Sequence, residues 1–390
     1  MLAIVAPLFV FGIVVFVHEL GHFLAAKAAG VYTPRFSIGF GKALWRKRWG
    51  ETEYVLAVLP LGGYVRMASR DDEATAFMEG GSENAVTAVS THGAPVDPDA
   101  MMPFGPKPIP EDRWFESKPL WARLIILLAG VTMNIVLSLV VMTGVFAYYG
   151  TPYLSTKADS LFAGRPGAIA GLQRGDSIVA IDGKAIDDWE GLVNRVSSSP
   201  GVPLSFEVIR EGTPRRLTVT PAADTVTNPS TGKVDRVGRI GIIPMQLSRP
   251  IGPIEAVSSG WTATWRMAGM VIDALEGLAT RRVAASELGG PIMIAQASVQ
   301  AARGGFEQLL FLLALISTNL AVFNLLPIPI LDGGQIVIAL LEGIKGKAFS
   351  LRTREYILRA GLAAVLLLFA IVTYNDLRRL VVSMVQGLTG

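Results

Sequence analysis

The chain has 390 residues, of which 51% are hydrophobic and only 17% charged. Soluble proteins usually carry about 25% charged residues, so this composition argues against a purely soluble protein and excludes a disordered chain. The sequence has no cysteine, which excludes a disulfide scaffold, cysteine catalysis and thiolate metal ligands. A net charge of +3 gives no sign of nucleic-acid binding.

Four apolar segments are predicted to cross a membrane, since a span needs about 20 apolar residues. They lie within residues 1–30, 119–150, 309–343 and 355–385. The first segment lacks the basic start and the cleavage site of a signal peptide, which favours a retained helix. Basic residues follow the first span, precede the second and separate the last two. These loops are therefore predicted to be cytoplasmic, with the region 150–308 on the outside.

The segments around the first two spans differ in composition. Residues 31–67 are rich in β-branched and aromatic residues with glycine turns, which predicts a β-sheet or hairpin associated with the membrane. Residues 68–118 are rich in proline, serine and acidic residues, which predicts a flexible cytoplasmic loop. Residues 250–305 carry Trp261 and Trp265 at helical spacing. This pattern favours interfacial amphipathic helices, with a soluble helix packed on the neighbouring domain as the alternative.

Residues 158–222 are predicted to form a small α/β domain. Strands are expected at 177–181 and 204–210, with a helix at 189–196 between them. The stretch 166–183 resembles a bacterial PDZ domain, present as a single copy. Such domains resemble modules that bind peptides by adding a strand to a sheet edge. A PDZ fold that acts only as a steric plug is the alternative.

The chemistry is indicated by His18-Glu19-Leu20-Gly21-His22. Positions four apart lie on one face of a helix, so both imidazoles can reach one metal ion while Glu19 holds the attacking water. This is the H-E-x-x-H pattern of zinc hydrolases. The chain has only three histidines, and this pair lies in an apolar helix, where ionisable side chains are costly and usually functional.

Catalytic zinc usually has three protein ligands, so one more is expected. His92 is the only other histidine, but it lies in the predicted flexible loop. Asp332 is the better candidate, because it is the only charged residue in the apolar stretch 309–341. Pro327 and Pro329 are expected to break that helix and to aim Asp332 at the histidines. An aspartate that snorkels or caps the helix is the alternative.

Two motifs together resemble the site-2 protease family of intramembrane zinc metalloproteases. They are His18 to His22 and Asn324-Leu325-Leu326-Pro327-Ile328-Pro329-Ile330-Leu331-Asp332-Gly333-Gly334. The segment 115–134 and the single PDZ domain are similar to the bacterial regulator-of-sigma-E protease branch. The resemblance implies a four-span α-helical membrane protein with a membrane-associated β-rich segment and an extracytoplasmic PDZ domain.

The resemblance also implies roles for individual residues. His18, His22 and Asp332 would bind one Zn²⁺ per chain, and Glu19 would be the general base. The residues that it assigns to substrate binding are Asn324, Pro327, Pro329, Gly39, Phe40, Gly41, Gly62, Gly63, Tyr64 and Val65.

The implied setting is the bacterial inner membrane, with the active site near the cytoplasmic side. The expected partners are the lipid bilayer and single-span substrates, such as anti-sigma factors or remnant signal peptides. An upstream site-1-type protease would act first, and no nucleic acid is expected.

Two other functions remain open at this point. A zinc transporter or metal-binding membrane protein would use the same histidines and aspartate but would not need Glu19. A catalytically inactive scaffold would act through its PDZ domain, although the intact Glu19 and Asp332 argue against it.

Overall fold

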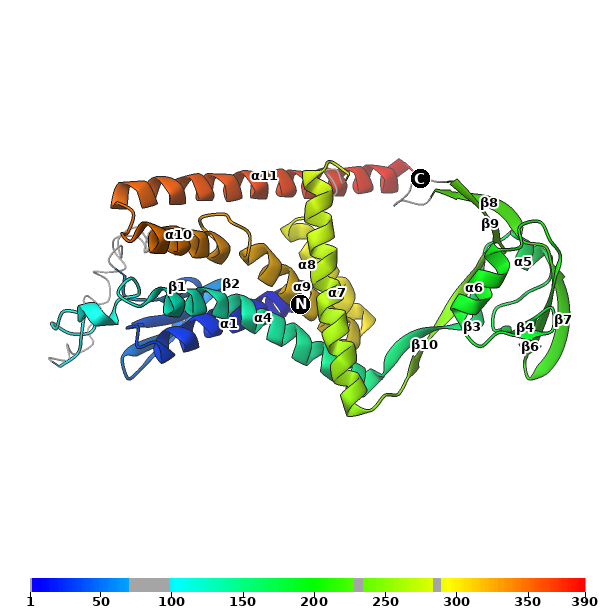
Figure 1. Cartoon of the computed structure of the whole chain (residues 1–390), viewed down its shortest axis with the longest axis horizontal. Helices are drawn as coiled ribbons and strands as arrows, with labels where there is room; N and C mark the ends of the chain where they lie inside the picture. The colour runs from blue at the N-terminus through cyan, green and yellow to red at the C-terminus, as the bar shows by residue number, and fades with distance from the viewer. Residues whose placement is uncertain (1, 70–98, 228–233, 283–288, 390) are drawn as a thin grey trace. The chain divides into compact units, whose positions relative to one another are not determined.

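The computed structural model describes residues 2–69, 99–227, 234–282 and 289–389. The chain divides into two compact units, which are Ala147–Gly252 and the remainder, Met1–Phe146 with Pro253–Gly390. Figure 1 shows the elements of both units. The larger unit contains the motifs singled out in the sequence.

Four helices of the described chain are long and apolar enough to cross a membrane. They are α1 (Leu2–Ala28), α4 (Leu120–Tyr149), α9 (Phe306–Asn324) and α11 (Leu351–Thr389). The expected third span is interrupted, since α9 ends at Asn324 and α10 (Asp332–Lys345) begins at Asp332. Proline lacks the backbone N–H that a helix requires, so Pro327 and Pro329 account for this break.

The β-rich segment is a sheet made by two long strands, β1 (Arg35–Trp49) and β2 (Thr52–Arg66). Residues 35–38 pair with 53–56 on one side and with 63–66 on the other, so both strands fold back on themselves. Gly39 and Gly41 permit the bend in β1 because each has a positive φ, of 88° and 87°. A core cluster of Phe23, Phe36 and Val65 packs this sheet on α1.

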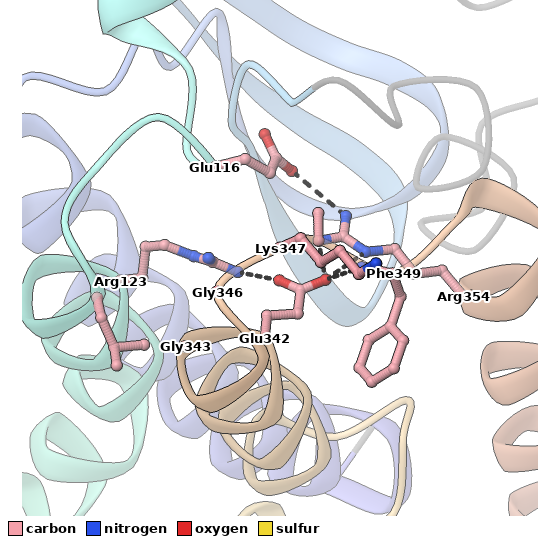
Figure 2. A pocket seen from close by; sticks show the side chains of 10 residues that line it. Glu116, Arg123, Glu342, Gly343, Gly346, Lys347, Phe349 and Arg354 are labelled. Atoms are coloured by element: carbon pink, nitrogen blue, oxygen red, sulfur yellow. Dashed lines mark hydrogen bonds and ion pairs between the residues drawn. The ribbon is translucent and has the colours of Figure 1, made fainter.

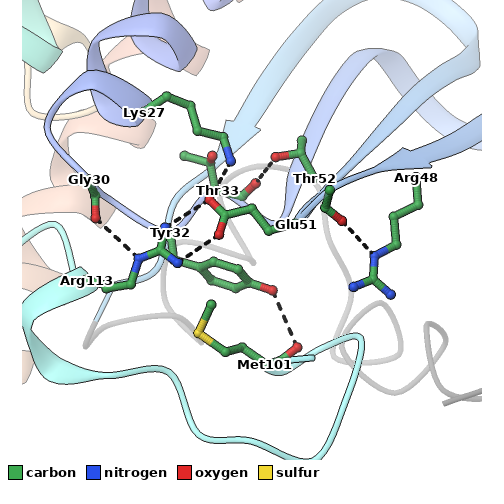
Figure 3. A network of polar contacts seen from close by, with 10 residues as sticks. Lys27, Gly30, Tyr32, Thr33, Arg48, Glu51, Thr52, Met101 and Arg113 are labelled. Atoms are coloured by element: carbon green, nitrogen blue, oxygen red, sulfur yellow. Dashed lines mark hydrogen bonds and ion pairs between the residues drawn. The ribbon is translucent and has the colours of Figure 1, made fainter. Parts of the chain in front are cut away.

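Part of the predicted flexible loop 68–118 is anchored to the sheet. Residues 70–98, which include His92, lie outside the described residues. The short helix η1 (Glu111–Arg113) ends in Arg113, which donates to both carboxylate oxygens of Glu51 at 2.8 and 2.9 Å. Lys27 donates to the same carboxylate at 2.6 Å (Figure 3). Charged side chains thus tie the chain around η1 to α1 and to the β1–β2 sheet, and the flexibility of 68–118 stays a prediction.

This network also fixes the protonation of its members. Burial alone would raise the pKa of Glu51, but the hydrogen bonds from Arg113 and Lys27 hold it below its ordinary value. Burial, with the nearby Glu51 charge, raises the pKa of Tyr32 to about 12. Glu51 therefore stays ionised and Tyr32 neutral at neutral pH.

The smaller unit is a sheet in the order β10-β3-β4-β6-β7, with β5 paired to β4. Its strands are β3 (Thr151–Leu161), β4 (Ser177–Ile181), β5 (Lys184–Ala185), β6 (Leu204–Arg210), β7 (Thr213–Val219) and β10 (Ile242–Arg249). A separate hairpin is formed by β8 (Ala222–Thr227) and β9 (Val234–Arg239), and the helices are α5 (Pro166–Ile169) and α6 (Trp189–Ser197). Leu192, Leu204 and Phe206 form part of its buried core. The unit is larger than the predicted 158–222, because β10 completes the sheet by pairing with β3.

Residues 250–305 contain the expected helices, α7 (Pro253–Ala279) and α8 (Pro291–Gly304). Trp261 and Trp265 are exposed on α7, and their rings meet edge to face. Asp376 of α11 caps the start of α8 by accepting backbone hydrogen bonds from Gly290, Ile292 and Met293 at 3.0, 3.0 and 3.1 Å. This carboxylate joins α11 to α8 at one end.

At its other end α11 is joined to α10 and α4 through Glu342 (Figure 2). This buried carboxylate accepts hydrogen bonds from Arg123 of α4 at 3.0 Å and from Arg354 of α11 at 2.6 Å. The three side chains line a cavity of about 630 Å³. The network fixes the end of α10 that lies away from Asp332.

Candidate metal centre

His18 and His22 lie on one face of α1, as their spacing predicts. Their side chains are buried, with 6% and 7% of their surface exposed. The two Nε2 atoms are 3.1 Å apart, and the rings meet at 83°. The helix therefore presents two imidazole nitrogens at one point.

Asp332 reaches the same point from α10. Its Oδ2 atom lies 3.3 Å from Nε2 of His18 and 3.4 Å from Nε2 of His22. The helix begins here in tight contact with the preceding turn, because a Cβ on Gly333 would lie 2.3 Å from the carbonyl oxygen of Leu325. Glycine at this position lets the chain turn back and start α10 at the aspartate.

The three donor atoms fit a zinc ion. Zn–N and Zn–O bonds of about 2.0–2.2 Å in a tetrahedron place ligand atoms roughly 3.3–3.5 Å apart, close to the separations observed here. Asp332 Oδ2 is buried and has no hydrogen-bond partner among the described residues, which suits a metal ligand better than a helix cap. Among the described residues, the group of potential metal ligands consists of His18, His22 and Asp332, whose ligand atoms all lie within 4.8 Å of one another.

Glu19 lies beside this group on α1. Its Cγ is 3.1 Å from where a Cβ on Gly63 would lie, so the edge strand of the sheet passes directly against it. The backbone of Val65 also lies close to the Glu19 carboxylate. The sheet and α1 therefore meet at Glu19, the carboxylate predicted to act on the attacking water.

Asn324, the last residue of α9, also reaches the histidines. Its Nδ2 atom is 3.1 Å from Nε2 of His18. Of the residues expected to bind substrate, the structure thus brings Asn324, Gly63 and Val65 to the site.

The other predicted substrate-binding residues lie on the sheet or in the helix break. The Phe40 ring stacks on Tyr64, with centroids 6.3 Å apart, and covers Gly62. Pro329 packs against Gly361 of α11. The members of this second group are Gly39, Phe40, Gly41, Gly62, Tyr64, Pro327 and Pro329, and their roles stay predictions.

A contribution from α4 was not predicted from the sequence. Most of its buried residues recur every fourth position, and Ile126, Gly130 and Asn134 from this row face the two histidines. A Cβ on Gly130 would lie 2.3 Å from Nε2 of His22. Small or polar residues at this spacing in an otherwise bulky apolar helix indicate a helix–helix interface, and this signal would have found them.

The chain is similar to known proteins along almost its whole length. The model of peptidase family M50 matches residues 6–368. Among curated proteins, the zinc metalloprotease RasP of Geobacillus kaustophilus is 31% identical over 97% of this chain and 98% of its own length. The regulator of sigma-W protease RasP of Bacillus subtilis is 30% identical, over 97% and 98%. The probable protease eep of Enterococcus faecalis is 31% identical, over 97% and 99%.

These matches run through both motifs and through the four apolar helices, so they concern a multi-pass membrane protein rather than an isolated domain. They also decide between the functions that the sequence left open, because the relatives are named as proteases. The chain therefore belongs to peptidase family M50, the site-2 proteases, and is a zinc metalloprotease.

Proposed function

We propose that this enzyme cuts peptide bonds within the membrane-spanning segments of single-span proteins. The observation that carries the proposal is the meeting of His18, His22 and Asp332 beside Glu19, with both histidines on α1, a helix long and apolar enough to span a bilayer. His18, His22 and Asp332 would hold the zinc ion. When bound, zinc lowers the pKa of a water molecule and polarises the scissile carbonyl.

Glu19 is the general base of the proposed reaction. Its carboxylate takes a proton from the attacking water and passes it to the leaving amine nitrogen. Asn324 is placed to donate from Nδ2 to the substrate carbonyl oxygen, because that amide lies beside the three donor atoms. Nothing in this sequence of steps requires a covalent intermediate with the chain.

The substrate is proposed to bind as an added strand. A helical segment hides its carbonyls in its own hydrogen bonds, so it must unwind locally before it is cut. Residues 63–66 pair with 35–38 on one edge, and within the described part of the chain no strand pairs with their other edge. Because Gly63 lies against Glu19, a substrate strand added at this edge would bring its backbone carbonyls to the Glu19 carboxylate.

The smaller unit, Ala147–Gly252, is proposed to be a single PDZ domain on the extracytoplasmic side of the bacterial inner membrane. There it excludes substrates that still carry bulky ectodomains, so that a site-1-type protease must act first. Basic residues follow the first span, precede the second and separate the last two, and this pattern supports the orientation. The Bacillus subtilis relative is named a regulator of sigma-W protease, which supports anti-sigma factors as substrates, with remnant signal peptides as a second class.

The test replaces Glu19 by Gln in the full chain, reconstituted in vesicles with a single-span reporter. We expect one zinc per chain by elemental analysis and at least a 100-fold loss of cleavage, as for other general bases. Glu276→Gln, at an exposed pair on α7, is the control and should cleave normally. Mass spectrometry of the products should place the cut inside the apolar segment. Cleavage by the Glu19 variant at the wild-type rate, or a cut only in a soluble loop, would contradict the proposal.

A further inference from the structure

One face of α4 supports both histidines of the metal centre. Ile126, Gly130 and Asn134 are spaced four residues apart, and each lies against the pair formed by His18 and His22. The backbone carbonyl of Ile126 is 2.8 Å from Nδ1 of His22, and the Asn134 amide is 3.3 Å from Nδ1 of His18. Gly130, between them, leaves room for both rings.

These contacts bear on which nitrogen of each ring carries a proton. Both histidines direct Nε2 at Asp332, so Nε2 is the atom available to a metal. A neutral imidazole that binds metal through Nε2 has its proton on Nδ1 and must donate it. For His22 the acceptor is the Ile126 carbonyl, which cannot act as a donor.

For His18 the corresponding group is the side chain of Asn134. This residue is fully buried, and its Oδ1 atom is without a hydrogen-bond partner in the part of the chain that the structure describes. A half-turn of the amide exchanges Oδ1 and Nδ2, which places the acceptor opposite Nδ1 of His18. The exchange satisfies the buried oxygen and the histidine proton together.

We propose that Asn134 is a positioning residue for the zinc site, accepting the Nδ1 proton of His18 through Oδ1. The inference rests on the proposed role of His18 as a ligand and adds a residue that touches neither zinc nor substrate. Helix α9 fixes the position of Asn134, since the Ser317 hydroxyl donates to the backbone carbonyl of Asn134 at 2.8 Å. Two neighbouring helices thus fix the orientation of the His18 ring.

The test measures zinc affinity of the full chain in detergent by competition with a chelator. Loss of such a partner typically weakens metal binding 10- to 100-fold, and we expect this for Asn134→Ala. Asn134→Asp keeps an acceptor and should bind zinc within about threefold of wild type. The matched control is Ser138→Ala, one turn further along the same buried row and bonded to Thr318 instead of a histidine. This control should bind zinc normally.

A second readout separates positioning from general damage. Cobalt substituted for zinc should give an altered visible spectrum in Asn134→Ala, and the wild-type spectrum in Asn134→Asp and Ser138→Ala. Wild-type affinity in Asn134→Ala, or equal loss in the Ala and Asp variants, would overturn the inference.

The inference and the proposed function fail in different ways. His22→Ala tests the site itself. A wild-type chain without zinc, or a His22→Ala chain that still binds it tightly, would refute the ligand set and with it the proposed mechanism. Zinc binding that depends on His22 but not on Asn134 would refute only the positioning role.

Discussion

Replacing Gly130 by alanine should disable the metal centre through a single methyl group. The added Cβ would lie 2.3 Å from Nε2 of His22 and 2.8 Å from Cε1 of His18, whereas ordinary contacts are 3.4–4 Å. Either the histidine rings or the backbone of α4 must therefore move by about 1 Å, whereas a metal site tolerates changes of only about 0.2 Å in its metal–ligand distances. Moving α4 instead would open its close contact with α1, where a Cβ on Gly21 would lie only 2.4 Å from the Ala129 carbonyl oxygen.

We expect zinc affinity to fall at least 100-fold in this variant, which corresponds to about 2.7 kcal/mol of binding free energy. The free energy of unfolding should fall by about 1–3 kcal/mol, the usual cost of overpacking. Chelator competition measures the first quantity, and thermal unfolding in detergent measures the second. Gly144→Ala is the control on the same helix, because a Cβ there meets nothing within 4 Å.

The reasoning would be refuted if Gly130→Ala bound zinc as tightly as wild type. That result would mean that α1 and α4 separate easily and that their contact does not shape the site. Equal losses in both glycine variants would point to the helix as a whole and not to the contact with the histidines.

Two further predictions concern other parts of the chain. Glu342→Gln should lower the stability of the full chain by about 3 kcal/mol in thermal unfolding, since it leaves two arginines around a buried site without their carboxylate. Glu355→Gln, at an exposed pair, should change stability by less than about 0.5 kcal/mol, and similar effects of the two would contradict the buried network. In the smaller unit, burial would raise the pKa of Asp176, but hydrogen bonds from Arg210 hold it below its ordinary value. The stabilisation should therefore be complete above about pH 4 and be lost as the pH falls through the lowered pKa. Hydrogen exchange of the full chain should show a constant difference from Asp176→Asn between pH 7 and 5 that shrinks below pH 4, and a difference independent of pH would refute the assignment.

The sequence was most informative where local rules apply. Helical spacing placed His18 and His22 on one face, and the cost of a charge in an apolar stretch singled out Asp332. Proline chemistry predicted the break before it. These signals need no knowledge of distant contacts, which is why the structure agrees with them.

Features that depend on distant pairing were not predictable in the same way. The folding of β1 and β2 back on themselves depends on pairing of 35–38 with two separate segments. The smaller unit extends beyond 158–222 because β3 and β10 pair across the whole unit. The spacing of Asn134 in α4 could indicate a helix–helix interface, but that His18 on α1 is its contact follows only from the packing of the two helices.

The break between α9 and α10 has a consequence for solvent. Within 325–331 the backbone leaves the helical pattern, and it is held by short-range bonds such as Ile328 N–H to Leu326 at 2.7 Å and Gln335 to Pro329 at 2.7 Å. At the proposed depth in the bilayer, such a backbone persists only where protein covers it or where it borders a hydrated space. Each hydrolysis consumes one water molecule, which hydrocarbon cannot deliver. We therefore expect water to reach the metal centre along the break at 325–331, which also directs Asp332 at the histidines.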